Sequence, residues 1–148
     1  MKKLFLITIL LSITQLKAQN TEAQNTEVQK AIEAFFEGFH AKDTIKMKSV
    51  CSDRLIMQTV IENEKGKSVK DESTKEFYVE IASIPADFVF KEKILKYTIQ
   101  VDGVLAQVWT PYEFYSNGKL SHSGINAFTL FKENEIWKII YVIDTRKK

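Results

Sequence analysis

The residues best suited by type and spacing to do chemistry are His122 and Glu113, which flank an Asn117-Gly118 dipeptide. Asn-Gly is the strongest short-range signal for a two-residue β-hairpin turn, and a hairpin closed there places His122 directly opposite Glu113. A carboxylate beside an imidazole orients the ring and raises its basicity, which is the arrangement of a general base. These two residues are the predicted catalytic pair; the alternatives are a ligand contact or a purely structural contact.

The same hairpin register predicts which side chains share a face with this pair. Aromatic rings on that face would supply apolar walls and hydroxyl groups, and amides would supply hydrogen-bond donors and acceptors. The predicted ligand-contacting residues are Gln107, Trp109, Tyr115, His122, Asn126 and Tyr141 from the strands, with Phe35 and Phe39 from the first helix.

Three helices are expected in the N-terminal half of the chain. The first begins at a capping box at Thr26 and carries apolar residues at helical spacing over Val28–Phe39. Asp43 can cap a second, shorter helix. Ser73 can cap a third helix, which Pro85 stops.

Runs of Val, Ile, Tyr, Phe and Thr, divided by turn residues, predict strands in the second half. Four antiparallel strands are expected at about 88–100, 104–116, 119–132 and 135–146, after one short strand at 55–61. The expected fold class is α+β, with three helices on one face of a curved antiparallel sheet of four long strands plus one short strand. A cone with an interior cavity follows from this layout.

This order of elements resembles the nuclear transport factor 2-like fold of the cystatin-like group. The C-terminal motifs resemble the lumazine-binding-like branch of that fold: Pro111-Tyr112-Glu113-Phe114-Tyr115, His122-Ser123-Gly124, Phe128, Trp137-Lys138-Ile139 and Asp144-Thr145-Arg146. The resemblance implies a cone-shaped domain and, by the name of the branch, pteridine-like ligands. The fold carries isomerases, dehydratases, hydrolases and pure binding modules, so the resemblance does not fix function.

Residues 1–18 have the features of a bacterial signal peptide. Two lysines precede an apolar run over residues 4–13, which is short for a membrane-spanning helix, and Ala18 offers a small residue for cleavage. A polar tail over 19–26 is expected to lead into a single domain over 27–148. We expect a periplasmic or secreted protein that keeps no stable membrane anchor after cleavage.

The composition excludes several classes of function. Without the three lysines of residues 1–18, 18 basic residues remain against 19 acidic ones, so the charge offers no basis for binding nucleic acid. A single cysteine excludes an internal disulfide. Two distant histidines without an H-E-x-x-H motif, and no Gly-rich phosphate loop, predict neither a metal site nor a cofactor.

The face of the sheet opposite the predicted cavity is also expected to be apolar. Its predicted residues are Val104, Ala106, Val108, Ile125, Ala127, Ile140 and Val142. Because the helices are already used on the other side, and large apolar patches mark interfaces, we expect a homodimer through this outer face.

Three other charged residues have simpler predicted roles. His40, near the end of the first helix, is expected to stabilise the helix C-terminus as a cation. Asp144 and Arg146 lie two residues apart in the last strand and are expected to pair with each other or with neighbours on the exposed side; the alternative is an anion site at Arg146.

Three classes of function stay open. The leading one is an exported small-molecule-binding domain with an unidentified ligand. The alternative is a cofactor-independent isomerase or lyase with His122 as base and Glu113 as its orienting residue. The third is an association module. A deep cavity with this pair in contact favours the first two, whereas a cavity filled by Trp109, Phe128 and Phe35 favours the third.

Overall fold

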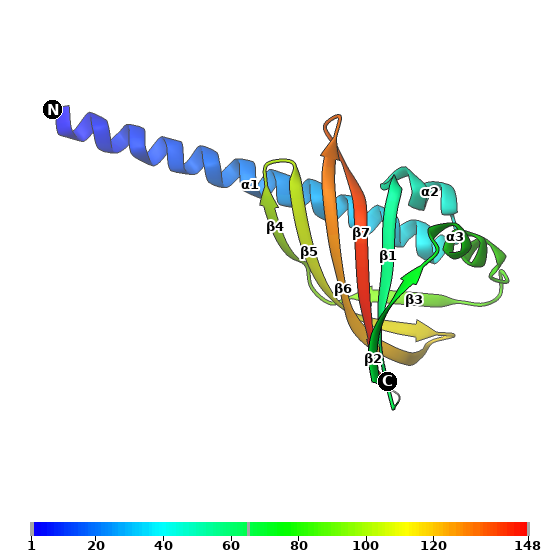
Figure 1. The fold of residues 1–148 in the computed structure, drawn as a ribbon. Coiled ribbons are helices and arrows are strands. Elements are labelled where there is room, and N and C mark those ends of the chain that lie inside the picture. The colour runs from blue at the N-terminus through cyan, green and yellow to red at the C-terminus, as the bar shows by residue number, and fades with distance from the viewer. Residues whose placement is uncertain (1, 65, 148) are drawn as a thin grey trace.

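The computed structural model describes the backbone of residues 2–64 and 66–147 and, within these ranges, the side chains from residue 22 onward apart from that of residue 63. The elements are α1 Lys2–Ala41, α2 Thr44–Ser49, β1 Cys51–Asn63, β2 Gly66–Glu72, α3 Thr74–Ser83, β3 Phe90–Ile94, β4 Thr98–Asp102, β5 Leu105–Ser116, β6 Lys119–Glu133 and β7 Ile136–Lys147 (Figure 1). The expected signal peptide falls on residues whose side chains lie outside this description. No helix within the described ranges is both long and apolar enough to cross a membrane.

The strands of the described residues form one curved sheet in the order β2-β1-β7-β6-β5-β3, with β4 pairing the same edge of β5 as β3. The predicted α+β layout is confirmed. The predicted strand count is wrong, because the described residues form seven strands. The sheet is also not wholly antiparallel, since β1 runs parallel to β7. The strand expected over 88–100 is split into β3 and β4. The sequence did not indicate β2, because this edge strand is polar and exposed along almost its whole length.

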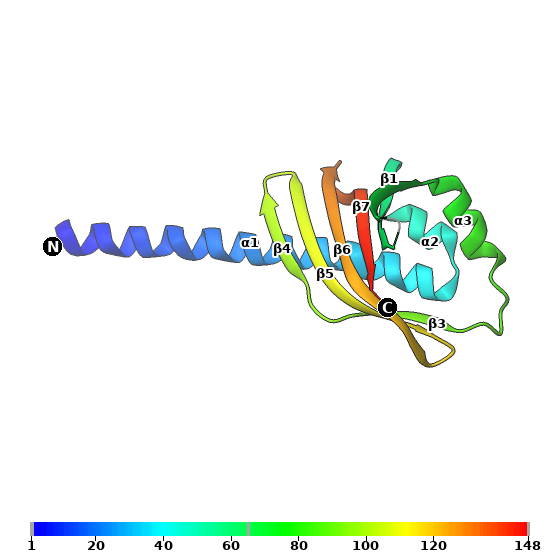
Figure 2. The ribbon, with the colours of Figure 1, turned by 60° about the horizontal axis from the view of Figure 1, so that its bottom comes forward.

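The second half of α1 lies across one face of the sheet, and α2 and α3 lie near its C-terminal end (Figures 1 and 2). We call this the helix-covered face and the opposite one the outer face. The buried α1 side chains repeat at helical spacing: Val28, Ala31, Ile32, Phe35 and Phe36. They form one hydrophobic cluster with strand residues that include Ala106, Val108, Phe128, Leu130 and Ile139. Each buried Val, Leu, Ile or Phe of this cluster contributes about 1.5–3 kcal/mol to folding.

The helix boundaries agree with the capping predictions in two cases out of three. The Asp43 and Ser73 side chains each accept hydrogen bonds from backbone N–H groups in the first turn of α2 and α3, as predicted. The predicted start at Thr26 is wrong. Its hydroxyl donates to the carbonyl of Glu22 at 3.0 Å inside α1, and the segment 19–26 expected as a tail is part of that helix.

A β-bulge in β6 overturns the predicted register of the catalytic pair. The Asn117-Gly118 turn forms as predicted, with both residues at positive φ. Beyond it Ser121 is an extra residue in β6, so His122 pairs with Phe114 and not with Glu113. One extra residue in a strand shifts its pairing by one, so each later side chain shares a face with a different set of side chains on the partner strand. The residues of β5 that were expected to face the cavity therefore face outward.

A second bulge acts in the same way on β7. Ile140 is an extra residue opposite the Thr129–Leu130 step of β6. Because of it, Trp137, Ile139 and Val142 are all buried on the helix-covered face, although strict alternation would turn Val142 outward.

The outer face predicted for the dimer is therefore partly wrong. Ala106, Val108 and Val142 are buried under the helices. Trp109, expected in the cavity, is 52% exposed on the outer face, where it pairs with Ala127.

Candidate functional site

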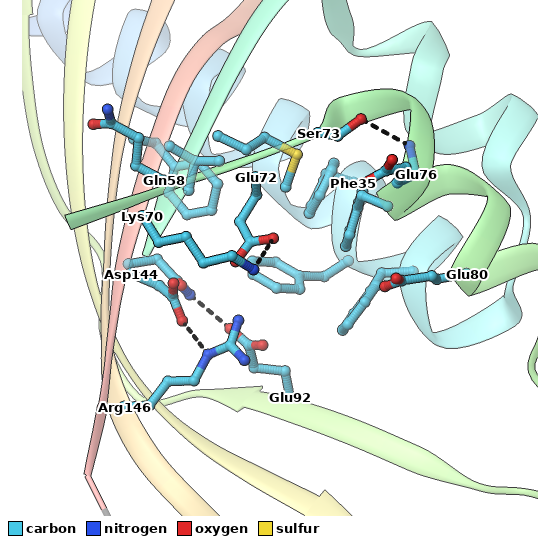
Figure 3. Close-up of a pocket in the computed structure, with 17 residues that line it drawn as sticks. Phe35, Gln58, Lys70, Glu72, Ser73, Glu76, Glu80, Glu92, Asp144 and Arg146 are labelled. Atoms are coloured by element: carbon cyan, nitrogen blue, oxygen red, sulfur yellow. Dashed lines mark hydrogen bonds and ion pairs between the residues drawn. The ribbon is translucent and has the colours of Figure 1, made fainter. Parts of the chain in front are cut away.

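A cavity of about 410 Å³ lies between the helix-covered face of the sheet and helices α1 and α3 (Figure 3). Its lining combines phenylalanine rings with a group of charged and amide side chains. A concave space of this size, with an aromatic wall and converging polar groups, is a candidate site for a small organic molecule.

Five phenylalanines form the apolar wall of the cavity: Phe35, Phe36 and Phe39 from α1, Phe77 from α3 and Phe128 from β6. Phe35 stacks on Phe39 with ring centroids 6.4 Å apart, and Phe39 stacks on Phe77 at 6.2 Å. This row of rings joins the two helices and presents π-electron faces beside the open space.

The polar end of the cavity is built from β3, β6 and β7. Asn126 Nδ2 donates to Glu92 Oε1 at 2.6 Å, and Arg146 Nε donates to Asp144 Oδ2 at 2.8 Å. The Thr59 hydroxyl donates to the other Asp144 oxygen. The Asp144–Arg146 pair is thus formed as predicted, and it lines the cavity, with Asp144 largely covered and the Arg146 side chain 59% exposed.

Tyr112 supports this polar end from β5. Its hydroxyl donates to the carbonyl of Thr145 at 2.9 Å and lies 3.5 Å from Asp144 Oδ2. Gly124 makes this approach feasible, because a Cβ at that position would lie 2.8 Å from the Tyr112 hydroxyl and would overlap the Thr145 carbonyl oxygen. Burial and the neighbouring Asp144 raise the pKa of Tyr112, so its hydroxyl stays protonated.

Glu92 is the most strongly perturbed acid of the site. Burial raises its pKa to about 7. The hydrogen bond from Asn126 and the Arg146 guanidinium oppose that shift, and the negative charge of Asp144 adds to it. At neutral pH the carboxyl group is therefore divided between its protonated and ionised forms.

His40 holds the strand that carries Glu92. The backbone N–H of Glu92 donates to His40 Nε2 at 3.0 Å, which requires an unprotonated nitrogen. Burial, and then the Lys91 ammonium, lower the pKa of His40. The predicted role as a helix-capping cation is therefore wrong, and His40 is a neutral acceptor.

Further carboxylates line the side of the cavity nearer α3. Glu76 and Glu80 lie one turn apart on that helix, and Glu72 at the end of β2 pairs with Lys70 at 3.0 Å (Figure 3). Within residues 2–64 and 66–147, no group of three or more His, Cys, Asp or Glu side chains is arranged to hold a metal ion.

The structure places six of the eight predicted ligand-contacting residues in two separate depressions, and Tyr115 and His122 line neither of them. Phe35, Phe39 and Asn126 line the cavity. Gln107, Trp109 and Tyr141 line a different depression, of about 290 Å³, on the outer face.

The predicted catalytic pair is not brought together. His122 lies on the helix-covered face and stacks on Phe114 with ring centroids 4.9 Å apart. Glu113 lies on the outer face, where it accepts a hydrogen bond from the Tyr115 hydroxyl at 2.8 Å and lies 3.7 Å from Lys93.

The sequence reasoning missed Glu92 altogether. Its signal was present in the alternation of β3, because Phe90, Glu92 and Ile94 share one face, and a lone acid stands there between two apolar residues. A carboxyl group at such a position enters the interior and becomes a candidate for function.

Comparison with known proteins identifies the fold. No protein-family model matches the chain, and no curated protein matches it. Many solved structures are similar to this chain, and three of them illustrate the likeness at low sequence identity. An NTF2-like protein of unknown function from Pseudomonas putida has a TM-score of 0.68 at 10% identity, over 84% of this chain and 87% of that chain.

The other two structures agree with the first. A proposed dehydratase of the NTF2-like family from Streptomyces avermitilis has a TM-score of 0.66 at 16% identity, over 86% of this chain and 99% of its own. A protein of unknown function with a cystatin-like fold from Nostoc punctiforme has a TM-score of 0.63 at 12% identity, over 82% and 90%. The chain therefore has the nuclear transport factor 2-like α+β fold, a cystatin-like fold in which a curved sheet and its covering helices enclose a cavity.

Proposed function

We propose that this chain is an exported domain that binds a small organic molecule in the cavity between α1, α3 and the sheet. The observation that carries the proposal is the combination of an aromatic wall with one partly titrated carboxyl group, Glu92, at its polar end. Partial burial of a carboxyl group costs folding free energy, so a cavity that keeps one is better explained by a ligand than by packing.

Native mass spectrometry of the protein, purified from the organism that produces it, tests this proposal. We expect a bound molecule of low mass, released on denaturation. Val142→Phe would fill the cavity and should abolish the adduct. Ile143→Phe, at the next residue of β7, faces the outer side and should retain it.

Circular dichroism of both variants separates loss of the ligand from loss of the fold. An adduct that survives Val142→Phe in a folded protein would contradict the proposed location. A wild-type protein that carries no adduct would contradict the proposal itself.

We also propose that the chain belongs to the lumazine-binding-like branch. The resemblance of its C-terminal motifs supports this, as does the position of two of them, since Tyr112 and Asp144-Thr145-Arg146 contribute to the polar end of the cavity. Such a relationship would not fix the ligand, because one fold carries many functions.

A second candidate function is acid–base catalysis as a cofactor-independent isomerase or lyase, with Glu92 in place of the predicted pair. A carboxyl group whose pKa is about 7 can both take up and release a proton at neutral pH, which suits a general base. One of the similar structures carries the description of a proposed dehydratase.

Hydrogen exchange into the bound molecule tests this candidate. The molecule that co-purifies with the protein is incubated with it in deuterated water, and its C–H signals are followed by NMR. We expect exchange with the wild type and with Glu37→Gln, an exposed carboxylate of α1. We expect no C–H exchange with Glu92→Gln. Equal exchange rates with the Glu92→Gln and Glu37→Gln variants would show that Glu92 is not the base.

A further inference from the structure

We propose that the ligand of this cavity is an organic cation, a protonated amine or quaternary ammonium group on an apolar body. The inference rests on the proposed function and names the chemical class of its ligand. It draws on the charge balance of the lining, on the way its cations are already paired, and on the aromatic wall.

The lining carries more carboxyl groups than cations. Its five acids are Glu72, Glu76, Glu80, Glu92 and Asp144, and its two bases are Lys70 and Arg146. The summed potential inside the cavity is therefore negative, and low-dielectric walls strengthen such a field.

The two bases are committed to neighbouring acids. Lys70 pairs with Glu72 at 3.0 Å, and Arg146 Nε donates to Asp144 at 2.8 Å. The Arg146 guanidinium group is thus already paired with a carboxylate of the same strand, which makes an anionic ligand less favourable.

Three acids of the lining have no such partner. No Lys, Arg or His of the described residues forms a salt bridge with Glu76, Glu80 or Glu92. The Asn126 amide donates a hydrogen bond to Glu92 Oε1, whereas Glu92 Oε2 accepts no hydrogen bond from any described residue. A cation in the cavity would supply the missing donor and the missing charge.

The aromatic wall fits the same ligand. The stacked row of Phe35, Phe39 and Phe77 lines the same cavity as the α3 carboxylates and Glu92. Cations are attracted to the faces of aromatic rings, and an apolar body gains from burial against them. Carboxylates near phenylalanine faces are therefore complementary to an ammonium group with a hydrocarbon part.

Three probes that share one body and differ only in head group test the proposal. They are 4-phenylbutylamine, 4-phenylbutanol and 4-phenylbutyrate, added to the full chain at pH 8 in low salt. Binding is followed by the shifts of backbone amide resonances of cavity residues and by calorimetry. We expect the amine to bind at least tenfold more tightly than the alcohol, and the carboxylate to bind more weakly than either.

Substitutions of single carboxylates identify which acid is responsible for the higher affinity of the amine. Glu92→Gln should weaken the amine about tenfold and leave the affinity for the alcohol within about twofold, because only the charge is removed. Glu37→Gln, whose carboxylate pairs with Lys46 on the exposed side of α1, should change neither affinity.

The affinity for the amine should also rise from pH 6 to pH 8. Glu92 ionises in this range while an alkylammonium stays charged. The groups that face Glu92 are His40 on α1, Tyr112 on β5, Asn126 on β6, Asp144 and Arg146 on β7, and Lys70 with Glu72 across the cavity on β2. Burial lowers the pKa of His40, which keeps this ring neutral as the acceptor for Glu92, and the Glu92→Gln variant should lose the rise in affinity.

The outcomes separate this inference from the proposed function. If the alcohol or the carboxylate binds in the cavity as tightly as the amine, or if Glu92→Gln leaves the affinity for the amine unchanged, the cation inference is wrong while the cavity remains a binding site. If none of the three probes shifts cavity resonances at millimolar concentration, both proposals fail.

Discussion

The backbone N–H of Glu92 donates a hydrogen bond of 3.0 Å to Nε2 of His40, and so fastens the strand that carries the buried carboxyl group to the last turn of α1. The acceptor nitrogen must be unprotonated for this bond to exist. The position of the acid in the cavity is therefore linked to the protonation state of a residue on another element.

This link predicts a loss of stability on acidification. The pKa of His40 is lowered in the folded protein, so below about pH 6.5 the unfolded chain binds more protons. The contribution of the bond is complete above that pH and is lost as the pH falls through the folded-state pKa. We expect the free energy of unfolding, measured in urea at pH 7.5 and 5.5, to fall more for the wild type than for His40→Gln, which does not titrate. Parallel pH dependences of the two proteins would contradict this.

Glu92→Gln should stabilise the protein at alkaline pH. The pKa of Glu92 rises from 4.5 to about 7 on folding, so the folded state binds the proton more tightly, and ionisation costs stability as the pH rises through this interval. Above pH 7 the neutral amide should add about 1–3 kcal/mol to the free energy of unfolding, and near pH 4.5 almost nothing. Glu37→Gln serves as the control and should stay within about 0.5 kcal/mol of the wild type at both pH values.

Gly124→Ala should destabilise the protein although it adds only a methyl group. The new Cβ would overlap the Thr145 carbonyl oxygen and crowd the Tyr112 hydroxyl, so β6 and β7 would have to separate. We expect a loss of about 1–3 kcal/mol in thermal or urea unfolding. Ser123→Ala, at the preceding residue, tests whether any alanine in this part of β6 has the same effect, and it should cost much less.

We propose that the chain forms a homodimer through the outer face, centred now on Trp109. This side chain is 52% exposed, and on the same face Leu105 and Phe131, which pair with each other further along β5 and β6, are also exposed. Apolar patches of this kind favour association. Trp109→Asp should convert a dimer to a monomer in analytical ultracentrifugation. Val69→Asp, an exposed site on the edge strand β2, should leave the assembly unchanged. A wild-type monomer at tens of micromolar would count against the dimer.

We propose that the exported protein begins at Gln19, after cleavage of residues 1–18. The described α1 side chains that are buried start at Val28, so cleavage at this point removes none of them. Amino-terminal sequencing of protein collected from the periplasm or medium should read Gln-Asn-Thr-Glu. Material that retains Met1 would contradict both the cleavage and the route of export.

Local chemistry predicted the elements well where turns are specific. The strands expected over 104–116, 119–132 and 135–146 agree closely with β5, β6 and β7, because Gly and Asn mark their ends. The two bulges at Ser121 and Ile140 have no comparable local signal, since an extra residue in a strand depends on how the whole sheet bends.

The two bulges caused most of the errors in the predicted site. Asn126 and His122 of β6 were assigned to the correct face. Trp109 and Glu113 of β5 were not, because the extra residue Ser121 shifts β6 by one residue relative to β5. The role of Glu92 was not predicted, because its partners come from α1, β6 and β7. No regular spacing along the chain connects these elements with β3.

The parallel pairing of β1 with β7 has a consequence for how the protein is made. β7 is the last strand in sequence, yet it occupies the middle of the sheet, between β1 and β6. Until residues 136–147 have left the ribosome, the early hairpin of β1 and β2 and the later meander have no strand to join them, so the core cannot close during synthesis. Long-range pairing of this kind also closes slowly. A polypeptide built in this order cannot complete its sheet while it is being translated, which suits the export proposed above.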